Sequence, residues 1–155
     1  MSMYALMFSF WLATGGAIAA QSVDPDEERA VRKVIESFIA ARSAKDVEAL
    51  TQLYTEDGQF TTALTEPVRG RAALQKLWAA DFSASNLGVI APRTIKTIQF
   101  IKPDTAVVTT VGEMGPFPQG ENRRISDVFV LTRNGQRWQI ASQHLAHLFP
   151  RLAPK

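Results

Sequence analysis

The chain has 155 residues, of which 46% are apolar and 21% charged, and this composition is typical of one globular domain with a single core. It contains no cysteine, which excludes disulfides, thiolate metal sites and cysteine nucleophiles. The 17 basic and 15 acidic residues give a net charge of only +2 without a long basic cluster, so we expect no nucleic-acid partner.

The first 20 residues predict a secretory signal peptide. They carry no charged side chain, and an apolar run from Tyr4 to Leu12 is followed by the small residues of 17–20. This order is typical of an apolar segment before a cleavage site, which we expect after Ala19 or Ala20. A retained membrane anchor is the alternative, but two glycines interrupt a stretch that is short for a membrane span. We therefore expect a periplasmic or secreted protein with no membrane contact after removal.

Three helices are predicted in the first half of the remaining chain. Asp24 and Pro25 are typical N-cap and first-turn residues, and the apolar stripe that follows continues to Arg42. Asp46 caps a shorter helix, which we expect to include Tyr54 and to end at 57–58. A strand over 59–64 follows, and then a third helix starts near 71. One face of this third helix carries Leu74, Leu77, Trp78, Asp81 and Phe82.

The second half of the chain predicts four strands. Segments 94–101 and 106–114 form one hairpin, and 124–133 and 136–145 form another around Asn134–Gly135. Helices followed by antiparallel strands predict an α+β domain over 24–148, in which three helices cover one face of a curved sheet. We expect a loop at 115–120 and a disordered tail over 149–155.

The second hairpin predicts a register. If Asn134 and Gly135 form a two-residue turn, alternate residues of both strands share one face, which is apolar near the turn and should face the core. The expected pairs are Leu131 with Trp138, Phe129 with Ile140, Asp127 with Ser142, and Ile125 with His144. Asp127 and His144 would then lie about 7 to 8 Å apart. A one-residue bulge would change this register.

Two polar residues of this face are candidate catalytic residues. Burial disfavours a carboxylate, so Asp127 could donate a proton to a carbonyl oxygen. It could equally be a structural acceptor for Ser142, Arg124 or a backbone amide. His144 could act as a general acid or base, or simply as a hydrogen-bond donor on the wall. We expect no metal site, because His144 and His147 are three residues apart and point to opposite faces of a strand.

Three segments carry a family resemblance: AARSAKDVEALTQLYTEDGQF (40–60), EPVRGRAALQKLW (66–78) and DVFVLTRNGQRWQIASQHLAH (127–147). The chain resembles the SnoaL-like and ketosteroid-isomerase-like branch of the nuclear transport factor 2-like superfamily. Within it, the ending is most similar to the small secreted proteins grouped with SgcJ and EcaC. The resemblance implies a cone with a cystatin-like arrangement, in which the sheet surrounds a cavity that the helices close. Such cones host isomerases, dehydratases, cyclases and silent binders, so the fold alone does not choose a function.

The resemblance fails at two isomerase positions. Thr62 stands where the family's isomerases carry the general base, and Phe38 stands where they carry a tyrosine of the oxyanion hole. Asp127 matches the acid of that hole, whose protonated form donates to a carbonyl in ketosteroid isomerase. Because Thr62 cannot act as a base and Phe38 has no hydroxyl, we expect no steroid isomerisation by that mechanism.

Three hypotheses of function remain after the motifs are considered. Nucleotide-binding, serine-hydrolase and zinc-protease motifs are missing, so we expect no cofactor and no nucleotide-dependent oxidoreductase. The first hypothesis is a binder of a lipophilic or aromatic small molecule, which Asp127 and His144 orient. Its expected lining residues are Phe38, Tyr54, Phe60, Trp78, Phe129, Trp138 and Ser142. The second is a cofactor-free isomerase, dehydratase or cyclase. A third is a dimeric interaction module, and we expect a homodimer.

Overall fold

The structure is a computed structural model that describes residues 24–62, 65–84, 93–115 and 122–148. The expected signal peptide, the expected loop at 115–120 apart from its first residue, and the expected tail lie outside the described residues. The helices are α1 (Pro25–Ala44), α2 (Val47–Gln52) and α3 (Arg71–Ser83). The strands are β1 (Tyr54–Thr62), β2 (Thr65–Arg69), β3 (Thr94–Lys102), β4 (Thr105–Met114), β5 (Arg123–Asn134) and β6 (Arg137–Leu148).

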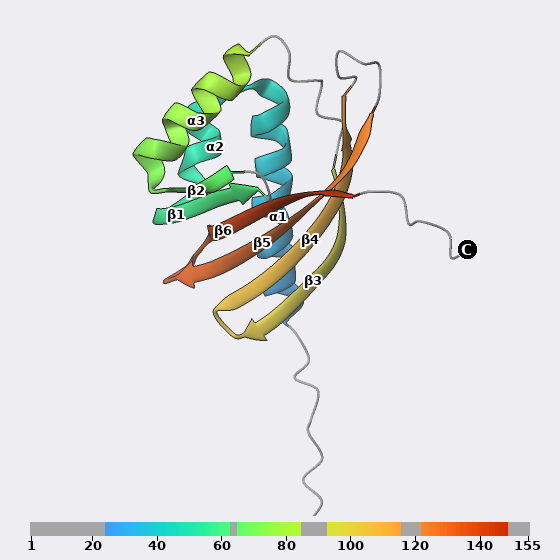
Figure 1. The fold of residues 1–155 in the computed structure, drawn as a ribbon. Coiled ribbons are helices and arrows are strands. Elements are labelled where there is room, and N and C mark those ends of the chain that lie inside the picture. The colour runs from blue at the N-terminus through green and yellow to red at the C-terminus, as the bar shows by residue number, and fades with distance from the viewer. Residues whose placement is uncertain (1–23, 63–64, 85–92, 116–121, 149–155) are drawn as a thin grey trace, which may run out of the picture.

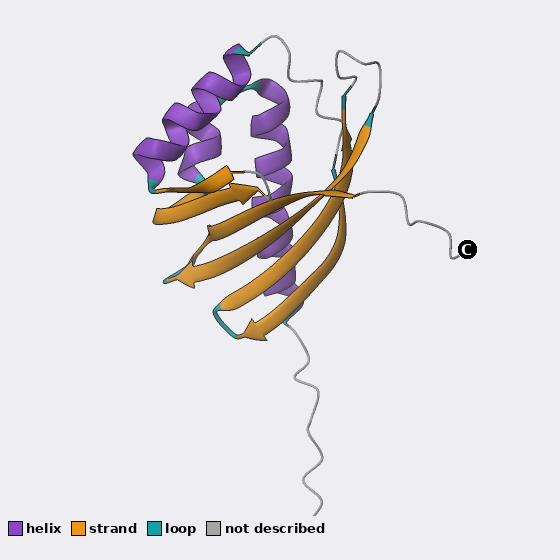
Figure 2. Cartoon of the chain, in the orientation of Figure 1, coloured by secondary structure: helices purple, strands orange, loops and turns teal. Residues whose placement is uncertain are grey.

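The strands form one six-stranded sheet in the order β2-β1-β6-β5-β4-β3. β1 and β6 run parallel, and every other neighbouring pair is antiparallel. The sheet is curved, and the helices lie on its concave side (Figure 1). Helices and strands are segregated to the two sides of the molecule (Figure 2). The predicted α+β fold, a curved sheet covered by three helices, is confirmed.

The predicted caps fix where the first two helices begin. The Asp24 side chain accepts a hydrogen bond from the Asp26 amide at 2.9 Å, and the Asp46 side chain accepts one from the Ala49 amide at 2.9 Å. Each bond satisfies one amide that has no partner within its helix. The buried stripe of α1 ends in a charged side chain, and its members are Val31, Ile35, Phe38, Ala41 and Arg42. This stripe packs α1 against the sheet.

The segment after α2 differs from the prediction. Tyr54 begins β1 rather than belonging to a helix, and Gly58 lies inside this strand at a register shift. A Cβ atom at Gly58 would lie 3.0 Å from the Thr55 carbonyl oxygen and 3.1 Å from that of Ile140. A Cβ atom here would push on backbone atoms of two strands, so the close approach favours glycine. Residues 65–69, which contain Pro67 and resemble a turn in sequence, form the edge strand β2, where a proline is tolerated.

The last hairpin also departs from the expected register. Its turn is Gly135–Gln136, so Asn134 pairs with Arg137 and Leu131 pairs with Ile140. This change preserves the faces, and the four apolar side chains near the turn are buried: Phe129, Leu131, Trp138 and Ile140. A bulge then shifts the register, because Val130 pairs with Ser142. From the bulge onward, the opposite set of β6 side chains faces the concave side.

One continuous core joins the helices to the sheet. Phe38 of α1 packs edge-on against Phe129 of β5, with ring centroids 4.9 Å apart. At the hairpin end, the Trp138 indole donates to a Glu27 carboxylate oxygen at 2.6 Å and so ties β6 to the start of α1. Within the described ranges, no helix is both long and apolar enough to cross a membrane.

Candidate functional site

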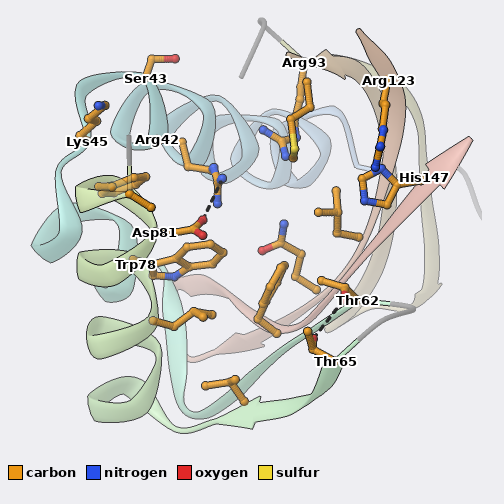
Figure 3. A pocket seen from close by; sticks show the side chains of 18 residues that line it. Arg42, Ser43, Lys45, Thr62, Thr65, Trp78, Asp81, Arg93, Arg123 and His147 are labelled. Carbon is orange, nitrogen blue, oxygen red and sulfur yellow. Dashed lines mark hydrogen bonds and ion pairs between the residues drawn. The ribbon is translucent and has the colours of Figure 1, made fainter. Parts of the chain in front are cut away.

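A cavity of about 690 Å³ opens between the helices and the concave face of the sheet. Figure 3 shows side chains from both sides of the fold pointing into it. Its apolar lining comes mainly from β1, β2, α3, β4 and β6, and includes Phe60, Val68, Leu77, Trp78, Phe82, Met114 and Leu145. Its volume lies within the range of small-molecule sites in proteins. The cavity is therefore the candidate site.

A fully buried chain of hydrogen bonds adjoins this cavity. The Tyr54 hydroxyl donates to Gln143 Oε1, and Gln143 Nε2 donates to Asp127 Oδ1 at 2.7 Å. Asp127 Oδ2 accepts from Arg93 Nε and, at 3.3 Å, from the Thr110 hydroxyl. Burial raises the pKa of the Tyr54 hydroxyl above its usual range, so this group remains a donor. These two hydrogen bonds fix the orientation of the Gln143 amide. Its oxygen accepts from the Tyr54 hydroxyl, and its nitrogen donates to the Asp127 carboxylate.

Asp127 is an acceptor in this arrangement. It is completely buried, and its described neighbours, Arg93, Thr110 and Gln143, all donate to it. These partners replace the expected acceptor contacts with Ser142 or Arg124. Arg93, whose side chain is only 2% exposed, forms an ion pair with Asp127. The geometry thus favours the structural interpretation of Asp127, and its catalytic role stays a prediction.

A second charged group lies at the cavity wall formed by α1 and α3. Arg42 Nη2 is 3.5 Å from Asp81 Oδ2, and the Arg42 guanidinium carbon lies 4.6 Å from the centre of the Trp78 ring. Figure 3 shows Arg42 directed toward Asp81 above the indole. Burial and the nearby Arg93 lower the pKa of Arg42. Burial raises the pKa of Asp81, although the Arg42 guanidinium opposes this change.

His144 and Ser142 do not face the cavity. His144 is exposed and pairs with Val128 rather than Ile125, and Ser142 accepts a hydrogen bond from Gln59 Nε2 at 3.1 Å. The expected inward position of His144, on the same face as Asp127 and paired with Ile125, is wrong, because the bulge after Ile140 reverses the faces of β6. Gln143 takes the inward position beside Asp127. The His144 and His147 side chains do lie on opposite faces, and it is His147 that lines the cavity.

Only two of the six expected aromatic residues line the cavity. Phe60 and Trp78 do so, and their ring centroids are 4.8 Å apart. The other four are buried in the core, outside the cavity lining: Phe38, Tyr54, Phe129 and Trp138. Expecting them at the cavity was wrong because their faces pack directly between helix and sheet, where no space is left. The position of an aromatic residue on the inward face of a helix or strand predicts that it is buried, but it does not show whether the residue packs in the core or lines the cavity.

The cavity contains polar residues that the sequence reasoning did not select: Arg42, Asp81, Arg93, Gln143 and His147. A signal existed for two of them, since Arg42 and Asp81 each occupy a position on the apolar stripe of a helix. A charged residue on such a stripe is rarely buried without a function or a partner. Arg93 and Gln143 carry no local signal. Arg93 is 34 residues away from its partner Asp127, and Gln143 reaches Asp127 only because of the bulge in the hairpin.

Thr62 and Phe38, which occupy the two isomerase positions, lie in different surroundings. Thr62 of β1 lines the cavity, and its hydroxyl lies 3.0 Å from that of Thr65. Phe38 contacts Phe129 and presents no polar group. Within the described part of the chain, no cluster of three or more histidine or carboxylate side chains could hold a metal ion.

Solved structures share this fold. A ketosteroid isomerase-like protein from Erwinia carotovora has a TM-score of 0.72 at 19% identity, covering 82% of this chain and 100% of that one. An NTF2-like protein with a cystatin-like fold from Novosphingobium aromaticivorans has a TM-score of 0.62 at 21% identity, covering 79% and 82%. A domain of unknown function with a cystatin-like fold from Nostoc punctiforme has a TM-score of 0.70 at 18% identity, covering 83% and 81%.

Sequence comparison supplies the family. No curated protein matches the chain. The model of the SnoaL-like domain family matches residues 31–150, which include the described helices and strands apart from the first turns of α1. A match over this length, together with the shared fold, is sufficient for assignment. The chain therefore belongs to the SnoaL-like domain family, within the NTF2-like and ketosteroid-isomerase-like group of folds.

Proposed function

We propose that this protein binds a lipophilic or aromatic small molecule in its cavity. The single observation that carries the proposal is the cavity of about 690 Å³, whose apolar wall is built from both helix and sheet. Burial of an apolar ligand surface there would supply the binding free energy, on the order of 25 cal/mol per Å² before the costs of association. The nearby Asp127 is already ion-paired, which favours binding over proton transfer at that residue.

A fluorescence titration tests this proposal. N-phenyl-1-naphthylamine is a neutral apolar dye that becomes fluorescent in a dry site. We expect saturable binding to the wild type and a loss of at least tenfold in affinity for Leu77→Trp, because the larger side chain fills the cavity. Ile101→Trp is the matched control, since Ile101 is 61% exposed outside the cavity lining. Equal affinity in both variants would exclude the cavity as the binding site.

Material from the natural host tests the same proposal without a chosen probe. Native mass spectrometry of the purified protein should show an added mass of a small organic molecule, released on denaturation. The Leu77→Trp variant purified in parallel should lack it, whereas Ile101→Trp should retain it. Added mass that is equal in both variants would place the molecule elsewhere on the protein.

A cofactor-free isomerase or dehydratase is the second candidate. One observation favours it: Asp81 and His147 line the same cavity, burial raises the pKa of Asp81, and the buried His147 Nδ1 has no hydrogen-bond partner in the structure. Such groups can donate or accept a proton. If the recovered ligand is a substrate, incubation should produce an isomer or a product lighter by one water. Asp81→Asn or His147→Gln should then slow the reaction, and unchanged rates in both variants would exclude this candidate.

Export and dimerisation complete the proposal. Export depends on the sequence of residues 1–20, and an intact mass starting at Ala20 or Gln21 in mature host protein would support it. Dimerisation is suggested by the exposed apolar side chains of three sheet residues, Ile101, Val128 and Leu148. Light scattering after gel filtration should give twice the mass of the mature chain, and the monomer mass would contradict it.

A further inference from the structure

The two buried arginines that line the cavity differ in their counterions. Among the described residues, Arg42 and Arg93 line it together with one carboxylate, from Asp81. Asp127 neutralises Arg93 from behind the wall, in an ion pair whose two side chains are nearly or completely buried. Arg42 has a poorer counterion, since Asp81 is 3.5 Å away and its side chain is 29% exposed. A cation with incomplete compensation therefore faces an apolar cavity.

Arg42 and its neighbour also have unused donors. The Arg42 side chain is 6% exposed, and its Nε has no hydrogen-bond partner in the structure. The indole Nε1 of Trp78, against which Arg42 stacks, is likewise buried without a partner. Buried donors are nearly always paired in folded proteins, and those that are not require an explanation. An acceptor that enters the cavity with a ligand would provide one.

We propose that the ligand is an apolar molecule that carries one anionic group, and that Arg42 binds this group. This inference rests on the proposed function of the cavity and names the ligand's chemical class. A carboxylate or a similar anion accepts well from a guanidinium, and such charge-assisted bonds are stronger than neutral ones. The apolar part of the molecule would contact the wall formed by Phe60, Leu77 and Leu145. Asp81 competes with the ligand for Arg42.

Two dyes with the same apolar body separate the charge from the cavity. 8-Anilinonaphthalene-1-sulfonate is anionic, and N-phenyl-1-naphthylamine is its neutral counterpart. The measured quantity is the ratio of the dissociation constant of the anionic dye to that of the neutral dye. A merely structural role of Arg42 would change both constants together and leave this ratio unchanged. We expect Arg42→Met to raise the ratio at least tenfold and Asp81→Asn to lower it severalfold.

A second ion pair on the same helix supplies the control. Arg29 and Asp26 form an exposed ion pair on α1, so Arg29→Met and Asp26→Asn should leave the ratio unchanged. Circular dichroism checks that each variant is folded. If Arg42→Met does not fold, Asp81→Asn decides the question alone, and an unchanged ratio there overturns the inference. A ratio within twofold of wild type in folded Arg42→Met also overturns it.

The outcomes distinguish this inference from the proposed function. Binding of the neutral dye that is lost in Leu77→Trp supports the cavity as a site, whatever the ratio shows. If that binding is seen and the ratio is the same in wild type, Arg42→Met and Asp81→Asn, the cavity remains a binding site and the anionic ligand is excluded. If neither dye binds in the cavity, the proposed function and the inference fall together.

Discussion

Loss of the buried charge at Asp127 should strongly destabilise the fold. In Asp127→Asn, the Arg93 side chain, only 2% exposed, loses its counterion while it still lies close enough to Arg42 to lower the pKa of that residue. Removing one partner of a buried ion pair costs about 3 to 5 kcal/mol. A domain of this size is stable by about 5 to 15 kcal/mol, so the loss is a large fraction of the total. It corresponds to a fall in Tm of roughly 6 to 20 °C.

Urea unfolding followed by circular dichroism measures this effect. Asp57→Asn, at an exposed aspartate, is the control and should stay within about 0.5 kcal/mol of wild type. The double variant Arg93→Met/Asp127→Leu should lose less stability than the sum of its single variants, because both charges are removed together. An Asp127→Asn protein that unfolds at the wild-type urea concentration would refute the reasoning, as would strict additivity in the double variant.

Three further predictions concern other parts of the structure. Gly58→Ala should reduce the free energy of unfolding in urea by about 1 to 3 kcal/mol, because its Cβ would press on backbone atoms, and a wild-type midpoint would contradict the close approach. The folded state raises the pKa of Asp81, so it binds more protons than the unfolded state above about pH 4, and stability falls as pH rises through that range. Urea unfolding from pH 3 to 7 should therefore show the stability of Asp81→Asn rising relative to wild type, and a constant difference would oppose this sign. His144→Gln should leave both stability, within about 0.5 kcal/mol, and dye binding unchanged, since His144 is exposed; weaker dye binding would restore it to the site.

Local signals predicted where the helices begin, although not where the second helix ends. Asp24 and Asp46 were recognised as N-caps from the residues that follow them, and both accept the expected backbone hydrogen bonds. The α3 stripe was also predicted, because an apolar period of 3.6 residues depends only on neighbouring sequence. These features require no knowledge of distant contacts, and for that reason they could be predicted from the sequence.

The bulge in β6 depends on a distant strand and could not be predicted. Ile140 pairs with Tyr54 and Ser142 pairs with Gln59, so the extra residue of β6 lies opposite the irregular stretch of β1 that contains Gly58. A count outward from the hairpin turn considers β5 alone and does not include this parallel neighbour. The inward position therefore passed from His144 to Gln143, and the predicted site changed with it.

Arg93 illustrates the same limit at the level of charge. It directly precedes β3 and pairs with Asp127, which is 34 residues later in the chain. Nothing in the local sequence around either residue identifies the other as its partner. A buried aspartate implies that some donor must reach it, but the identity of that donor is a property of the sheet order.

The position of β6 in the sheet constrains the order in which the protein can fold. β6 is the last described strand in the chain, yet it lies between β1 and β5. Until β6 joins the sheet, β1 and β2 are separated from β3, β4 and β5, because no other described strand lies between the two groups. A polypeptide truncated before Arg137 would lack β6, and its two groups of strands would keep open edges. Open edges are prone to intermolecular strand pairing. Contacts this distant in sequence also slow folding, so the sheet should form slowly and be completed only when β6 is inserted between its neighbours.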